Sequence, residues 1–294
     1  MALAAKIPYD HPFAGGYPGI GSQPLPTDSD CLTYLSAVET GVAVAVDAFF
    51  RDSKAAGVFD ALKACCILAG ARTLAGALVP VVGDAPTNVA DGFVEGDFSR
   101  TSGLTGDGTS YIDSGRANDD DPQNDQHMAV YVQSPNTGST GAYIGNADTS
   151  GSTVIGSNPV NLHVFARSQS VNADTYGNGS ETGFIGLTRS SSASYTFRLL
   201  SANQDSNNAS SVPTGFTSLV FARDQDGTAI NITDATIAFY SIGTSLSLED
   251  LDTAVSNLIN RLKFALLVGE NPSGLDPDTI DYIVRGYEAG GSLE

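Results

Sequence analysis

The chain has 294 residues, and 33 acidic against 14 basic side chains give it a formal net charge of −19 at neutral pH. This charge repels phosphate backbones and anionic headgroups, which argues against nucleic-acid binding and against adsorption to membranes. The longest apolar tract, residues 64–83, is interrupted by Arg72 and Pro80, so it does not predict a membrane span.

The three cysteines are Cys31, Cys65 and Cys66, an odd number that does not describe a disulfide framework. The opening residues contain no apolar stretch of the kind that a secretory signal requires. We therefore expect the chain to fold in a reducing cytoplasm and to depend on packing rather than on covalent cross-links.

Residues 1–26 are dense in proline and glycine, which excludes a helix or a regular strand there. Aromatic side chains nonetheless recur among these residues, at Tyr9, Phe13 and Tyr17. The segment is either a disordered end or an extended arm whose aromatic side chains dock on a neighbouring subunit.

Residues 27–82 are predicted to be helical. Apolar residues recur at intervals of three and four along 32–49, and Gly57 separates them from a second such stretch at 59–69. The adjacent cysteines lie in this second stretch, where we expect them to be small buried side chains of a helix. Residues with N-cap chemistry stand at the start of the segment: Thr27, Asp28 and Asp30.

Residues 83–123 are rich in glycine, aspartate and asparagine, and they predict a connector with possible edge strands near Phe98, Leu104 and Tyr111. Over residues 124–243 the apolar period becomes two, with turn-forming residues between the runs. This pattern predicts an antiparallel sandwich or barrel. The candidate strands are 127–132, 142–145, 161–166, 182–187, 193–198, 217–222 and 235–240.

Within this region Phe165-Ala-Arg167 recurs as Phe221-Ala-Arg223, an echo too short to establish a repeat.

Residues 244–268 predict an amphipathic helix that Ser247 caps. Its continuous apolar face suggests a docking surface, and it includes Leu251, Val255, Leu258 and Leu262. Residues 269–294 form a C-terminal tail with a second apolar patch that contains Ile280 and Ile283, which we also expect to dock on a partner.

The search for catalytic residues is negative. Glu181 is the only glutamate in 124–243, whereas glycoside hydrolysis uses two carboxylates, and no nucleophile elbow or zinc-binding helix is present. The densest oxygen cluster, Asp119, Asp120, Asp121 and Asp125, is either a calcium site or a solvated acidic loop. We expect His127 and His163 to be packed or edge residues rather than acids or bases.

Several segments resemble virion proteins of tailed phages, those of cyanophages among them. They are Phe59-Asp-Ala-Leu-Lys63, Cys66-Ile-Leu-Ala-Gly-Ala-Arg72-Thr-Leu74, Arg116-Ala-Asn118, Asn124-Asp-Gln-His127-Met-Ala-Val-Tyr131, Thr182-Gly-Phe-Ile-Gly186 and Ala238-Phe-Tyr-Ser-Ile-Gly243. The resemblance covers roughly residues 55–265. It implies a concanavalin A-like (laminin G-like) jelly roll preceded by a helical segment. It assigns no activity, because fold analogy alone cannot do so.

The resulting prediction is a mainly β protein: an antiparallel jelly-roll sandwich flanked by an N-terminal helical segment and a C-terminal amphipathic helix. We expect a non-catalytic structural protein of a tailed-phage virion, a head decoration, head fibre or tail appendage. It would form homo-oligomers and contact other capsid or tail proteins. The alternatives are a lectin-like tail protein that recognises host surface glycan and, last, a depolymerising hydrolase that uses Glu181.

Overall fold

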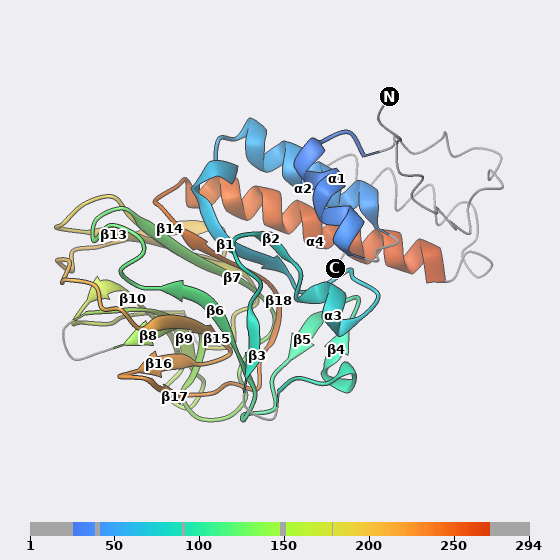
Figure 1. The fold of residues 1–294 in the computed structure, drawn as a ribbon. Helices are drawn as coiled ribbons and strands as arrows, with labels where there is room; N and C mark the ends of the chain where they lie inside the picture. Colours follow the sequence, from blue (N-terminus) through green and yellow to red (C-terminus); the bar gives the residue numbers. More distant parts are fainter. Residues whose placement is uncertain (1–25, 39–41, 90–91, 148–150, 178, 271–294) are drawn as a thin grey trace.

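The computed structural model describes residues 26–38, 42–89, 92–147, 151–177 and 179–270. Three layers are stacked in it: a layer of helices, a β-sheet beneath the helices, and a second β-sheet beneath the first (Figure 1). The predicted fold class, an antiparallel jelly-roll sandwich flanked by helices, is confirmed. Among the described strand pairs only β8 and β16 run parallel.

We call the sheet next to the helices the helix-covered sheet. Its strands follow the order β14-β13-β12-β7-β18-β1-β2, with β5 paired to β18 and β4 paired to β5. The bounds are β1 Leu62–Ile67, β2 Pro80–Val82, β4 Phe98–Ser99, β5 Gly103–Thr105, β7 Gln126–Ser134, β12 Gly183–Arg189, β13 Tyr195–Leu199, β14 Ala202–Ser206 and β18 Thr236–Gly243.

The other sheet, here the outer sheet, follows the order β11-β10-β9-β8-β15-β6-β3, and a hairpin of β16 and β17 is attached to β8. The bounds are β3 Thr87–Val89, β6 Tyr111–Ala117, β8 Gly141–Ala147, β9 Ser152–Asn158, β10 His163–Ser170, β11 Asp174–Tyr176, β15 Thr217–Val220, β16 Arg223–Gln225 and β17 Thr228–Ile230.

Helices α1 (Ser29–Ala37), α2 (Ala43–Ala55) and α4 (Leu248–Glu270) cover one face of the helix-covered sheet (Figure 1). The short α3 (Leu74–Ala77) and the 3₁₀ turns η1 (Phe59–Ala61) and η2 (Glu95–Asp97) lie in connections. No helix among the described residues is long and apolar enough to cross a membrane.

The helix-covered sheet is buried on both faces, and β18 shows this best, since all eight of its residues are buried. Phe239 belongs to the core beneath the helices, where its ring centroid lies 5.8 Å from that of Phe49 on α2. The next residue, Tyr240, points the other way into the core between the two sheets. Neighbouring residues of one strand therefore serve two separate apolar cores.

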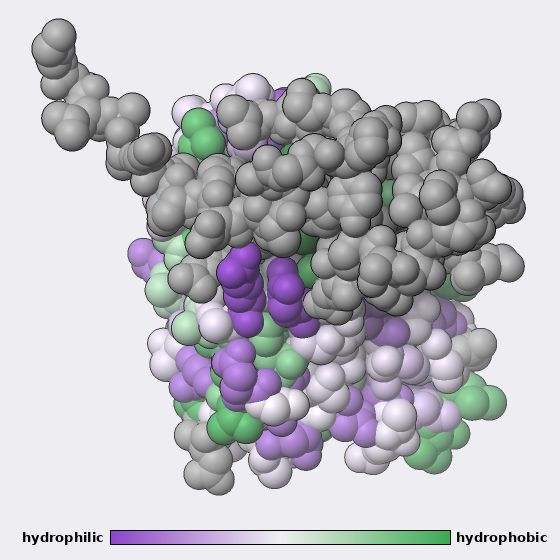
Figure 2. Space-filling model, turned by 90° about the vertical axis from the view of Figure 1, so that its right-hand side faces the viewer, coloured by the Kyte–Doolittle hydropathy of each residue, from purple (hydrophilic) through white to green (hydrophobic). Residues whose placement is uncertain are grey.

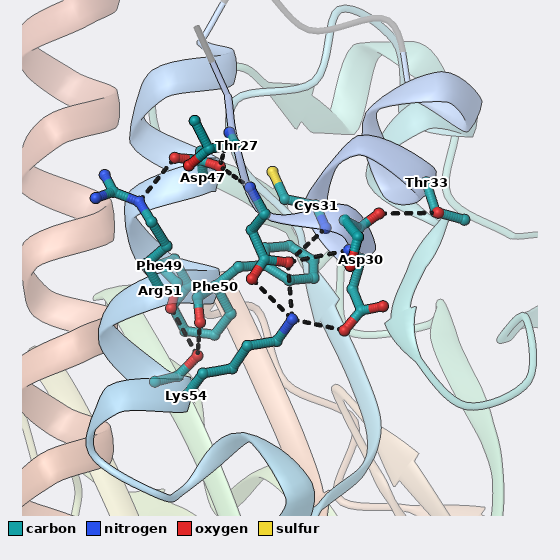
Figure 3. Close-up of polar contacts among 12 residues, drawn as sticks. Thr27, Asp30, Cys31, Thr33, Asp47, Phe49, Phe50, Arg51 and Lys54 are labelled. Atoms are coloured by element: carbon teal, nitrogen blue, oxygen red, sulfur yellow. Dashed lines mark hydrogen bonds and ion pairs between the residues drawn. The ribbon is translucent and has the colours of Figure 1, made fainter. Parts of the chain in front are cut away.

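Polar contacts attach α1 to α2 (Figure 3). The Asp28 carboxylate accepts from the N–H groups of Asp30 and Cys31 and so caps α1, as predicted. The Lys54 ammonium on α2 lies 2.7 Å from Asp28 and 2.6 Å from Asp30. Beside it, Asp47 on α2 accepts from the N–H of Thr27 at 2.8 Å, so α2 fixes the residues that lead into α1.

All seven strands predicted over residues 127–240 are present. Strands also form near Phe98, Leu104 and Tyr111, but β5 and β6, at the last two, are paired on both sides and are not edge strands. The helix predicted over 59–69 is wrong. Its apolar residues form β1, which pairs with β18 and has five buried residues of six. Cys65 and Cys66 are buried as expected, but they point into different cores from a strand. The sandwich therefore begins at β1 rather than at residue 124.

Helix α4 begins where predicted, with the hydroxyl of Ser247 accepting from the N–H of Asp250 at 3.3 Å. The stripe expected to dock on a partner is instead packed inside this chain, beneath α2 and over the helix-covered sheet. Its members are Leu251, Val255, Leu258 and Leu262, each fully buried. An ion pair of 2.7 Å between Arg198 on β13 and Asp252 fastens the same helix to the sheet.

Replacing Leu258 with alanine should lower the free energy of unfolding by about 2–5 kcal/mol, because a fully buried leucine leaves a cavity between α4 and the sheet. The matched control is Leu200→Ala, at a side chain 66% exposed, which should change stability by less than about 0.5 kcal/mol. Urea unfolding of both variants measures the difference, and equal costs would contradict the burial of the helix.

Candidate functional site

The four aspartates of the predicted calcium site do not converge. Asp121 forms a bidentate ion pair with Arg116, with N–O distances of 2.8 and 2.6 Å. Asp120 accepts from the N–H of Ala117 at 2.8 Å, and Asp119 is exposed. In the part of the chain that the structure describes, no group of three or more acidic, histidine or cysteine side chains could hold a metal ion.

Asp125 has a separate role, since its carboxylate accepts from both the N–H and the hydroxyl of Ser245, at 2.8 and 2.6 Å. Ser245 lies just before α4, so the contact fixes the approach to that helix. The predicted docking residues Tyr9, Phe13, Tyr17, Ile280 and Ile283 lie outside the described residues.

Glu181 is buried in the loop before β12, and its carboxylate accepts from the N–H of Gly179 at 2.8 Å. A Cβ on Gly177 would come within 1.9 Å of the same carboxylate, so the loop closes tightly around it. This geometry gives Glu181 a part in shaping the loop.

His127 is a packed residue of β7, as expected. Its Nδ1–H donates to the carbonyl of Thr244 at 2.6 Å, since a carbonyl can only accept, and Nε2 accepts from the hydroxyl of Ser241 at 3.1 Å. Burial lowers the pKa of His127 to about 4, because the charged imidazolium would lose its hydration.

The outer face of the outer sheet carries a different set of side chains. Along β10, His163, Phe165 and Arg167 alternate with Val164 and Ala166, which face the core between the sheets. The first three therefore point away from that core.

Phe165 lies over β9, where a Cβ on its partner Gly156 would come within 2.5 Å of the ring. The ring is 9% exposed and packs with Ala142 and Val154 in a small cluster of its own. Phe165 is thus a packed apolar side chain of this face.

The β16–β17 hairpin belongs to the outer sheet, because Asp224 and Gln225 of β16 pair with Asn146 and Ala147 of β8, in the layer away from the helices (Figure 1). Asp226 and Gly227 both have positive φ, at 53° and 82°, as a two-residue turn between twisted strands requires. The hairpin begins with Arg223, whose Nη2 donates to Gln225 at 3.1 Å.

The strand register places Arg167 and Arg223 near each other. The ladder partner of Arg167 is Val154, which pairs with Gly145 of β8, and Arg223 precedes Asp224, which pairs with the next residue of β8, Asn146. Burial lowers the pKa of Arg223, and repulsion by Arg167 lowers it further. The Nε atom of each guanidinium is buried, and neither Nε has a hydrogen-bond partner among the described residues. A buried donor without a partner costs about 1–3 kcal/mol, and more when it is charged.

Six other cations of the described chain have polar partners. Arg189 is fully buried, yet it donates to the carbonyls of Ser168, Ser191, Ser194 and Asn208. Ion pairs join five more to aspartates: Arg51–Asp47, Lys54–Asp28, Arg116–Asp121, Arg198–Asp252 and Arg261–Asp52. Arg167 and Arg223 have no ion pair among the described residues, and each has a buried Nε without a hydrogen-bond partner there, so this pair is the candidate site.

Sequence reasoning missed this site. The Phe-Ala-Arg echo marks both arginines, but the two copies occupy strands that are far apart in the sequence and have different roles. Only the pairing of β16 with β8 brings the two arginines onto one face, whereas Phe221 packs in the core between the sheets and Phe165 outside it.

The sequence matches no protein-family profile and no curated protein. Among solved structures, the binding domain of botulinum neurotoxin serotype D is similar at a TM-score of 0.45 and 12% identity, over 67% of this chain and 51% of that one. The Ruminococcus gnavus IT-sialidase CBM40 aligns at a TM-score of 0.33 and 12% identity, over 45% of this chain and 82% of that one. The NanB sialidase from Streptococcus pneumoniae aligns at a TM-score of 0.40 and 12% identity, over 51% of this chain and 26% of that one.

This chain thus spans about half of the toxin domain and about a quarter of the NanB chain. At such identities the likeness concerns the fold alone.

The depressed pKa of His127 makes stability depend on pH. Below its ordinary pKa of 6.5 the unfolded chain takes up a proton that the folded chain refuses until about pH 4, so stability falls as the pH drops through this window. From neutral pH to about pH 5 the loss should be about 2 kcal/mol.

Urea unfolding at several pH values tests this against His127→Gln, which has no titrating group at this position. The wild type should lose more stability than the variant over this window. Parallel curves for the two proteins would contradict the desolvation of His127.

Proposed function

We propose that this chain is a non-catalytic, lectin-like binding module that recognises saccharide on the outer face of its outer sheet. The observation that carries the proposal is the asymmetry of the sandwich. One sheet is covered by α1, α2 and α4, whereas the described helices leave the opposite side of the sandwich to side chains of β10 and the β16–β17 hairpin (Figure 1).

The chemistry of that outer face suits a hydroxylated ligand. Arginine, histidine and glutamine side chains project there, and they supply several hydrogen-bond donors at fixed positions on paired strands. Elements of a sheet hold such groups more rigidly than a loop does, which reduces the entropy lost when a ligand binds.

A second proposal concerns where the module works, and it is supported by the position of the described ends. The described chain starts at Pro26 and closes with α4 at Glu270, and both α1 and α4 lie in the helical layer, opposite the outer sheet (Figure 1). Attachment through this side would leave the outer sheet facing away from the attachment point.

Together with the resemblance to tailed-phage proteins, this arrangement supports a virion structural protein. It would be made in the host cytoplasm, assembled as a homo-oligomer with capsid or tail proteins, and would display its sandwich outward.

A glycan array probed with the full-length protein, with and without calcium, tests the first proposal. We expect binding to a subset of surface saccharides, competed by the free saccharide, and no release of reducing sugar from the bound ligand. An array that stays silent under both conditions would contradict saccharide recognition. Release of sugar that disappears in Glu181→Gln would instead establish a hydrolase.

Electron microscopy of purified phage particles, labelled with an antibody fragment against the sandwich, tests the second proposal. Label spread over the capsid would support a head decoration, and label at the tail tip would support a tail appendage. Absence of the protein from particles, checked by mass spectrometry of the same sample, would contradict any virion role.

Figure 2 shows the side of the molecule that lies on the right in Figure 1. On its described part, hydrophilic and hydrophobic residues are interspersed, without one large apolar area. Scattered apolar residues of this kind are ordinary for a protein surface and mark no partner.

A further inference from the structure

We infer that Arg167 and Arg223 together bind an anionic group of the ligand, the carboxylate or sulfate ester of an acidic saccharide. This inference rests on the proposed saccharide recognition and adds the substrate class. It depends on the position of the two guanidinium groups, on their Nε atoms without a partner, and on the absence of an ion pair to either among the described residues.

The two arginines meet from different elements. Arg167 projects from the outer face of β10, where its ladder partner on β9 is Val154. Arg223 begins β16, and the next residue, Asp224, pairs with the buried Asn146 of β8, so Arg223 faces outward. Each is only partly buried as a residue, but its Nε is covered. The terminal nitrogens of the two guanidinium groups are therefore accessible to solvent, whereas the Nε atoms are not.

The neighbouring acidic residue does not neutralise the pair. Asp224 follows Arg223 directly, yet its carboxylate turns into the hairpin and accepts from the N–H of Gly227 at 2.7 Å. The chain has 33 acidic residues, and still no ion pair to either arginine is found among the described residues. The two positive charges repel each other, and an anion bound from outside the chain would reduce this repulsion.

The shape of the guanidinium group limits the chemical groups that the site can bind. It is planar and donates in a fixed fork, which matches two oxygens of one carboxylate or sulfate group. Two forks from different strands can grip one oxyanion from two directions. A neutral sugar would leave both charges uncompensated, so the site should discriminate against it.

The experiment uses an array in which each neutral oligosaccharide is matched by a uronate-containing and by an O-sulfated counterpart. It is probed with the full-length protein and with Arg167→Gln, Arg223→Gln and the double variant. The matched control is Arg261→Gln, which removes one positive charge that is paired with Asp52 in the helical layer.

The wild type should prefer acidic members, and each single substitution should weaken their binding about tenfold, as expected for the loss of one charge-assisted contact. The control variant should bind like the wild type. Free glucuronate or sulfate should also raise the melting temperature of the wild type but not of the double variant, which separates loss of binding from loss of folding.

Preference for the uronate or for the sulfated member identifies the anion, and either result supports the inference. Equal binding of neutral and acidic members, or an unchanged preference in the double variant, would overturn it while leaving saccharide recognition intact. Binding to no member of the array would overturn both the inference and the proposed function.

Discussion

The burial of the helix-covered sheet on both of its faces is the constraint on which the rest of the structure depends. Strands β7, β18 and β1 form its centre, with one apolar core above them and another below. Since every residue of β18 is buried, α2 and α4 must cover one side and the outer sheet the other. The three layers therefore stabilise one another, and removing either outer layer would expose an apolar sheet to water.

The same constraint explains which elements could be predicted from sequence. Helix α4 has one apolar stripe and a polar back, and most strands of the sandwich alternate clearly, so their patterns identified them. Strand β1 is buried on both sides and shows no alternation, which made its apolar run indistinguishable from a helix. Strand β9 was missed because its sequence, Ser-Thr-Val-Ile-Gly-Ser-Asn, is small and largely polar.

The candidate site was less predictable than the fold. Acidic residues that are close in sequence suggested a metal site, but in the structure they bind Arg116, Ser245 and backbone N–H groups. The arginines that lack such partners are separated by many residues and come together only because β16 pairs with β8 in the outer sheet. Proximity along the chain indicated the wrong cluster, and the pairing of distant strands determined the better candidate.

The pairing of β1 with β18 has a consequence for how the chain reaches its fold. These strands lie near opposite ends of the described sequence, yet they are neighbours at the centre of one sheet. During synthesis β1 must wait, with its apolar side chains uncovered, until nearly all of the chain has left the ribosome. Such long-range pairing slows folding and leaves the nascent chain open to aggregation. The exposure of apolar side chains during synthesis thus follows from the topology, independent of how stable the finished sandwich is.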